Sequence, residues 1–207
     1  MLQRTSVLAL ASAFVLIGGD ARAELSANVG WVSDYYYRGL FQARSSASAG
    51  LDWSGGGFYA GTWAADLDQG LEVDGYFGYG QDVGPATVSV GFTGYYYTQD
   101  FDDTYQELNF GVGLGIASID VAVGEYDNFD GPTQDYAWYA LTLAKNGFHG
   151  RVATFGRDFE GSYLELGYSL TLAELDLGVT LIVADDDLVG ESTEQLVFSI
   201  AKTFDIR

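Results

Sequence analysis

The chain has 207 residues and a formal net charge of −20, and it contains no cysteine and only one histidine. Disulfides, thiolate metal sites and cysteine nucleophiles are therefore excluded. The acidic balance argues against nucleic acid as a partner, because nucleic-acid binding requires stripes of lysine and arginine. The 28 glycines and 15 tyrosines are more typical of a β-barrel wall with its loops than of a cytosolic enzyme.

The N-terminus has the order of a secretory signal peptide. Arg4 precedes an apolar run from Val7 to Ile17, and Ala21-Arg22-Ala23 follows as an A-x-A cleavage site. The apolar run is too short to cross a bilayer as a helix, which needs about 20 residues. We expect residues 1–23 to be a signal peptide cleaved after Ala23, and residues 24–207 to form the exported domain.

Alternation with a period of two residues dominates the rest of the chain. Between residues 163 and 172, leucine and tyrosine alternate with small or polar residues, and residues 175–183 repeat the pattern. Such alternation indicates β-strands with one apolar face. Runs of this kind occur at the spacing of membrane strands, at residues 25–33, 44–53, 57–66, 71–80, 86–97, 104–114, 116–126, 134–144, 148–157, 161–172, 174–184 and 193–204.

The connections between these runs alternate in length. Five are short and contain residues such as Gly55-Gly56 and Asn146-Gly147. The others are longer and mostly acidic, at residues 34–43, 67–70, 98–103, 127–133, 158–160 and 185–192. Outer-membrane barrels have short periplasmic turns and longer external loops. The sequence therefore predicts an all-β, antiparallel transmembrane barrel of about 12 strands (range 10–14) in a bacterial outer membrane, with both termini in the periplasm.

Aromatic residues gather near the predicted strand ends. Those near the outer ends are Tyr35, Tyr36, Tyr37, Trp63, Tyr95, Tyr96, Tyr97, Tyr105, Tyr126, Tyr136, Trp138, Phe155 and Tyr163. Girdles of aromatic side chains at both membrane interfaces are a feature of outer-membrane barrels. We expect these residues to lie in such a girdle; the Tyr35–Arg38 segment is also a candidate for an inward-folded constriction.

The first part of the exported domain also resembles a known family. The segments Ser26-Ala27-Asn28-Val29 and Ser33-Asp34-Tyr35-Tyr36-Tyr37-Arg38-Gly39, and later Gly57-Phe58-Tyr59-Ala60-Gly61-Thr62-Trp63-Ala64, are similar to blocks of the TorF family of proteobacterial porins. The specific match covers about the first third of that domain and rests on these motifs. The resemblance implies an outer-membrane barrel with a channel role, and it carries over no substrate.

The alternation also assigns charged residues to the lumen. Those expected to line a pore are Asp52, Asp66, Glu72, Asp74, Glu107, Asp120, Asp135, Glu165, Asp176, Arg38, Arg44 and Arg151. Rings of carboxylates favour cations by concentrating them and repelling anions. The alternative is that the acids pair with the arginines and only fill the lumen. A barrel of about 12 strands lies between a filled eight-stranded barrel and an open porin, so both arrangements are physically allowed.

Neither catalysis nor a metal centre has a clear signature. His149 follows the Asn146-Gly147 turn, on the predicted periplasmic side, and no G-x-S-x-G motif is present. Residues 127–131 resemble a calcium loop only superficially, because Tyr126 and Ala137 occupy the first and twelfth loop positions. Acidic loop clusters suited to weak Ca²⁺ or Mg²⁺ binding are Asp100, Asp102 and Asp103, and Asp185, Asp186 and Asp187; solvated external loops are the other interpretation.

These patterns predict a passive channel for small polar, cationic solutes, without cofactor or enzymatic activity. Its other expected partners are outer-membrane lipid and lipopolysaccharide. A second hypothesis is a structural or adhesive barrel that binds a partner through its acidic loops. A third is a lipid-modifying enzyme centred on His149.

Overall fold

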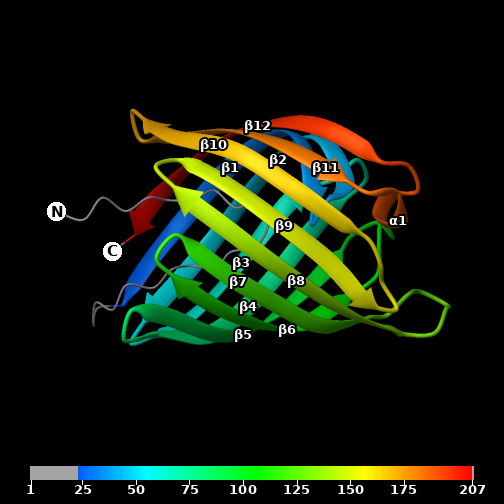
Figure 1. Ribbon diagram of the computed structural model, residues 1–207, viewed down its shortest axis with the longest axis horizontal. Helices are drawn as coiled ribbons and strands as arrows, with labels where there is room; N and C mark the ends of the chain where they lie inside the picture. The colour runs from blue at the N-terminus through cyan, green and yellow to red at the C-terminus, as the bar shows by residue number, and fades with distance from the viewer. Residues whose placement is uncertain (1–22, 207) are drawn as a thin grey trace.

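The computed structural model describes residues 23–206, which form a single closed β-barrel (Figure 1). Residues 1–22 of the expected signal peptide lie outside the described residues. The strands are β1 (Glu24–Tyr37), β2 (Leu40–Gly55), β3 (Phe58–Asp66), β4 (Leu71–Val83), β5 (Ala86–Tyr97), β6 (Tyr105–Leu114), β7 (Ala117–Tyr126), β8 (Gln134–Lys145), β9 (Phe148–Arg157), β10 (Ser162–Leu172), β11 (Leu175–Ala184) and β12 (Thr193–Ile206). The predicted antiparallel barrel of about twelve strands is confirmed.

Each strand pairs antiparallel with its neighbours in sequence, and β1 closes the barrel on β12. The closing register runs from Leu25 opposite Ile206 to Val32 opposite Ser199. Closure matters in a bilayer because the hydrocarbon offers no hydrogen-bond partner to the backbone groups of an open sheet edge.

The two ends of the barrel differ. Five two-residue turns, such as Asn146-Gly147 and Ala173-Glu174, lie at the end where β1 begins and β12 ends. We call this the short-turn end. The longer connections lie at the other, the loop end, together with the short helix α1 (Asp186–Val189) (Figure 1). Asp185 caps this helix by accepting a hydrogen bond from the Leu188 backbone N–H.

One predicted loop is wrong. Residues 34–43 were expected to form an external loop, but β1 extends to Tyr37 and β2 begins at Leu40. The connection is the two-residue turn Arg38-Gly39, in which both residues have positive φ, 49° and 84°. Tight hairpin turns favour this conformation because its twist matches the flanking strands.

The outer face of the barrel wall is apolar. Large side chains exposed on it include Leu51, Phe77, Phe110, Leu141, Leu166 and Phe198. An exposed apolar band around the whole wall is what contact with hydrocarbon requires, and a water-soluble protein rarely exposes so much of it. The only helix in the described part of the chain is far too short to cross a membrane.

Burial of the inward face changes along the barrel axis. On β10, Tyr163 and Glu165 are buried, Gly167 and Ser169 are half-buried, and Thr171 is exposed. β12 shows the same gradient from Val197 to Thr203. The lumen is therefore filled towards the loop end and opens to solvent towards the short-turn end.

Candidate functional site

A charged pair crosses the lumen near the loop end. Arg38 Nη1 and Nη2 donate hydrogen bonds to Glu107 Oε2 and Oε1 over 2.8 and 2.7 Å. The hydroxyls of Tyr95 and Tyr136 also donate to Glu107, each over 2.8 Å. The Glu107 side chain is fully buried and that of Arg38 is 5% exposed. Paired, two-pronged contacts of this kind are among the strongest hydrogen bonds in proteins.

The β1–β2 turn carries Arg38 to this position from the opposite wall. Glu107 belongs to β6, which is four strands from β2 around the barrel. The turn itself rests against β10 and α1, because a Cβ atom on Gly39 would lie 2.9 Å from both Tyr163 Cγ and Leu188 Cδ2. Glycine at this position thus permits both the positive φ and the close contact. The turn folds into the lumen and Arg38 bridges its two sides.

Aromatic rings enclose the guanidinium group. Arg38 Cζ lies 4.3 Å from the ring centre of Trp138 and 5.0 Å from that of Tyr37. These distances allow cation–π attraction, which is stronger where water is excluded. We call the layer formed by Tyr37, Arg38, Tyr95, Glu107, Tyr136 and Trp138 the constriction layer.

Apolar clusters on two sides support the constriction layer. One contains Ala122, Ala140, Ala153 and Tyr163 around Trp138. The other groups Tyr35, Ala43, Ala65 and Leu67. Alanines on the wall leave room for the large rings that pack beside them.

Two further acids adjoin the constriction layer on β4. Glu72 is fully buried and accepts a hydrogen bond from the Tyr35 hydroxyl over 2.8 Å. Asp74, two residues along the same face, is 6% exposed. Within the described residues, Asp74 Oδ1 and the Tyr37 hydroxyl are buried without a hydrogen-bond partner. Such atoms cost free energy when dry, so they favour entry of water or of a polar solute.

A second charged level lies on the short-turn side of the constriction layer. Arg151 Nη1 is 3.4 Å from Glu165 Oε2, and Arg151 Nε donates to the Thr142 hydroxyl over 3.1 Å. Asp120, buried on β7, accepts from Ser118 over 3.3 Å. Acidic side chains outnumber basic ones at this level, as they do around the constriction layer.

The short-turn half is lined by polar groups of mixed size, and the side chains of Tyr59, Tyr76 and His149 lie against Gly78, Gly61 and Gly167. Asp52 accepts hydrogen bonds from the Asn28 amide and the Tyr76 hydroxyl. Glycine and serine occupy many of the other inward positions, such as Gly50, Ser89 and Ser199. Together they form a polar vestibule that ends at the constriction layer.

Most of the charged residues expected in the lumen lie on the inward face. They are Arg38, Asp52, Glu72, Asp74, Glu107, Asp120, Arg151, Glu165 and Asp176. Three others do not. Asp66 is exposed because Ala65 is the inward residue at that end of β3. Asp135 is likewise exposed, next to inward Tyr136, and its carboxylate is 3.7 Å from Arg157. A shift of one residue moves a side chain to the other face of a strand.

Arg44 is outside the lumen for a different reason. Simple alternation places it on the same face as Ser46, which is buried. Ser45 has a positive φ of 54°, and the β1–β2 pairing passes from Val32–Ser46 to Asp34–Arg44. This irregularity turns the chain by one face, so Arg44 is exposed on the outer side.

The aromatic residues at the outer ends were mostly misplaced. Many were expected at the membrane interface but point into the lumen, among them Tyr35, Tyr95, Tyr136, Trp138 and Tyr163. Their odd or even position within each strand would have predicted the inward face. Tyr95 precedes Tyr97 by two residues and Tyr105 precedes Glu107 by two, so they share the face of the inward polar residues. Tyr36 and Tyr96 do face outward.

His149 lies on the inward face of β9, across from Gly167 and Ala144. Its Nδ1 atom has no hydrogen-bond partner in the described residues. Across those same residues, no group of three or more histidine, aspartate or glutamate side chains is arranged to hold a metal ion. In the acidic loops, Asp102 instead accepts from Tyr105 and Tyr126.

A closed antiparallel barrel with an apolar outer face and a polar, partly filled lumen is the architecture of transmembrane β-barrel proteins. The chain belongs to a family described as "Bacterial protein of unknown function (Gcw_chp)", whose model matches residues 17–198. The narrower resemblance to TorF-family porins stays a prediction. No curated protein matches the chain.

Three solved structures of membrane proteins were compared with the chain, and the first shares its fold. One, from work on in-meso crystallization of membrane proteins, is 8% identical with a TM-score of 0.61, over 88% of this chain and 84% of that one. OpdK of Pseudomonas aeruginosa with vanillate is 12% identical, TM-score 0.42, over 79% of this chain and 57% of OpdK. OprD of the same organism is 13% identical, TM-score 0.44, over 89% and 67%. The chain thus spans little more than half the length of OpdK.

Proposed function

We propose that this protein is a narrow outer-membrane channel for small polar solutes, with a preference for cations, and that the structure represents its closed state. The observation that carries the proposal is the shape of the polar lumen. A vestibule lined by polar groups leads from the short-turn end past the level of Arg151 and Glu165 to the constriction layer, in which Arg38 and Glu107 meet across the barrel. Export would use a signal peptide cleaved after Ala23.

The charges of the lumen support the preference for cations. At the two charged levels, the acids Glu72, Asp74, Glu107, Asp120 and Glu165 outnumber the bases Arg38 and Arg151. An excess of carboxylates in a narrow pore, where little water screens them, attracts cations and repels anions.

Opening requires the least change at the β1–β2 turn. Except between the outer ends of β1 and β12, backbone pairing joins the wall strands to one another, whereas Arg38 is held across the lumen through side-chain contacts with Glu107 and Trp138. Movement of this turn away from β6 would break the ion pair, hydrate the unpaired Asp74 oxygen and widen the lumen at the constriction layer.

Conductance in planar bilayers tests this function. Folded protein should carry a current whose reversal potential in a salt gradient indicates cations. The double replacement Asp74→Asn with Asp120→Asn should shift that potential towards zero, because it replaces two lumen carboxyl groups by neutral amides. Asp135→Asn, a matched change at an exposed acid, should leave it unchanged. Absence of current from folded protein, both wild type and with the constriction pair broken, would rule the channel out.

A further inference from the structure

The wall of the barrel is split at one place. β1 continues to Tyr37 and β12 begins at Thr193, but their pairing stops at Val32 opposite Ser199. At the point of separation, the Ser33 hydroxyl accepts a hydrogen bond from the Phe198 backbone N–H over 3.0 Å. By contrast, β11 and β12 stay joined to the loop end, where Ala184 lies opposite Thr193. The backbone ladder is therefore interrupted between the outer ends of β1 and β12.

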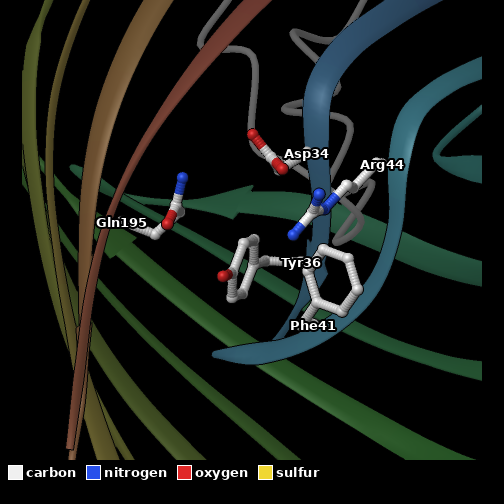
Figure 2. Close-up of a pocket in the computed structure, with 5 residues that line it drawn as sticks. All are labelled: Asp34, Tyr36, Phe41, Arg44 and Gln195. Atoms are coloured by element: carbon white, nitrogen blue, oxygen red, sulfur yellow. The ribbon is translucent and has the colours of Figure 1, made fainter.

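A cavity of about 400 Å³ lies at this split, lined by Asp34, Tyr36, Phe41, Arg44 and Gln195 (Figure 2). The first four belong to β1 and β2, and they flank inward-facing Tyr35 and Ala43 on the opposite face of the wall. Gln195 belongs to β12 and shares the inward face with buried Val197. Figure 2 shows Gln195 on the far side of the gap from the other four residues. The cavity thus lies between outward-facing residues of β1 and β2 and an inward-facing residue of β12.

The cavity contains one charge of each sign. Asp34 and Arg44 are direct cross-strand partners, a position in which opposite charges normally attract. Among the ion pairs of the described residues, however, neither side chain takes part in one. The Arg44 backbone N–H donates a hydrogen bond to the Asp68 carboxylate, and this contact does not involve the guanidinium group. Both charges are available to a bound molecule.

An apolar surface adjoins these charges. The rings of Tyr36 and Phe41 pack edge to face, with their centres 5.5 Å apart. Phe41 is 44% exposed, so part of its ring is uncovered. A volume of about 400 Å³ lies in the usual range of small-molecule sites.

From this arrangement we propose that the split between β1 and β12 is a lateral binding site for small amphipathic zwitterions. Arg44 binds the anionic group, Asp34 binds the ammonium group, and the apolar part contacts Tyr36 and Phe41. Gln195 offers a hydrogen bond from the lumen side. The site does not depend on conduction through the constriction layer, because its residues belong to the wall.

The test measures binding to the full exported chain in nanodiscs of phosphatidylglycerol, a lipid whose headgroup is not zwitterionic. L-phenylalanine is the probe. Phenylacetate keeps only its negative charge, 2-phenylethylamine keeps only the positive one, and N-acetylphenylalaninamide keeps neither. L-phenylalanine should bind at least about tenfold more tightly than each of these, since each lost charged contact weakens binding to that extent.

Matched variants assign the charges. Arg44→Gln should abolish the advantage of L-phenylalanine over 2-phenylethylamine, and Asp34→Asn its advantage over phenylacetate. Arg157→Gln and Asp135→Asn, which change an exposed pair elsewhere on the rim, should have no effect. Equal affinity for all four probes, or wild-type affinity in both site variants, would overturn the proposal. Loss of binding in phosphatidylethanolamine nanodiscs would also overturn it, by showing that a lipid headgroup occupies the site.

Conductance of the same purified protein in planar bilayers separates this site from the proposed channel. Binding without current would contradict only the channel, and current without selective binding would contradict only the lateral site.

Discussion

Replacing Glu107 by glutamine should open the constriction layer. Glu107 accepts four hydrogen bonds, two from Arg38 and one each from Tyr95 and Tyr136. A glutamine of nearly the same shape keeps one acceptor oxygen but replaces the other by an amide group that donates. Arg38 is then left as a buried cation without its counter-charge.

The size of the effect follows from burial. The two side chains are 5% and 0% exposed, so little solvent can compensate for the lost pair. Removing one partner of a buried ion pair costs about 3–5 kcal/mol. If this cost falls on the closed state alone, the ratio of closed to open molecules should fall by a factor of about 10² or more.

Single-channel recording in planar bilayers measures this ratio directly as open probability. Glu125→Gln, the same chemical change at an exposed outward position of β7, is the matched control and should behave as wild type. The double variant Arg38→Gln with Glu107→Gln removes the uncompensated cation as well. The double variant should therefore be more resistant to unfolding in urea than Glu107→Gln alone, and closer to wild type.

Two results would refute this reasoning. One is an equal open probability for Glu107→Gln and Glu125→Gln in folded protein. The other is an equal loss of stability in the single and the double variant, because the cost would then not arise from an unpaired buried cation.

Three further predictions concern other parts of the barrel. Gly39→Ala should raise open probability, since alanine at φ 84° is strained by about 1–2 kcal/mol and its Cβ would meet Tyr163. The control is Gly56→Ala, at φ 60°, where an added Cβ has nothing within 4 Å. This control has the backbone strain without the contact, and it should not change gating. Arg151→Met should lower the free energy of unfolding in urea by about 3 kcal/mol because Glu165 loses its partner in a half-filled lumen, whereas Arg157→Met, at an exposed pair, should cost under about 1 kcal/mol. An unchanged midpoint for Arg151→Met would contradict the first value. At the short-turn end, Lys202 donates to Glu174 over 2.9 Å and holds the pKa of this carboxyl below its usual range. A depressed folded-state pKa contributes stability above the unfolded pKa, which is lost as the pH falls through the folded pKa. Lys202→Gln should therefore raise the pKa of Glu174 in an NMR titration, and an unchanged pKa would show that the contact is absent in solution.

Alternation in the sequence was sufficient for the fold. Each strand shows its apolar face locally, as residues 163–172 do, and glycine-containing turns such as Asn146-Gly147 separate the strands. These are short-range properties, since a side chain's face depends only on its parity within the strand. The sequence therefore determined an all-β barrel with short turns at one end and, except where β1 and β2 meet, close to its observed strand boundaries.

Parity alone also placed most lumen charges correctly, including Glu107 and Glu165 on the inward face. It failed where the backbone breaks the period. A single positive φ at Ser45 reverses the face of Arg44, and a serine at that position gives no local warning. The aromatic residues failed for another reason, because rings suit both a membrane interface and a filled lumen.

Contacts across the lumen were decided only by the tertiary structure. Arg38 and Glu107 are 69 residues apart in the chain, and they meet because closure brings β6 opposite the β1–β2 turn. The split between β1 and β12 likewise arises where the first and last strands join, from a register that no local pattern encodes. The sequence by itself thus determined a barrel with an acidic interior. Closure of the sheet decided where that interior is blocked and where its wall is open, because both depend on residues that only the closed sheet brings together.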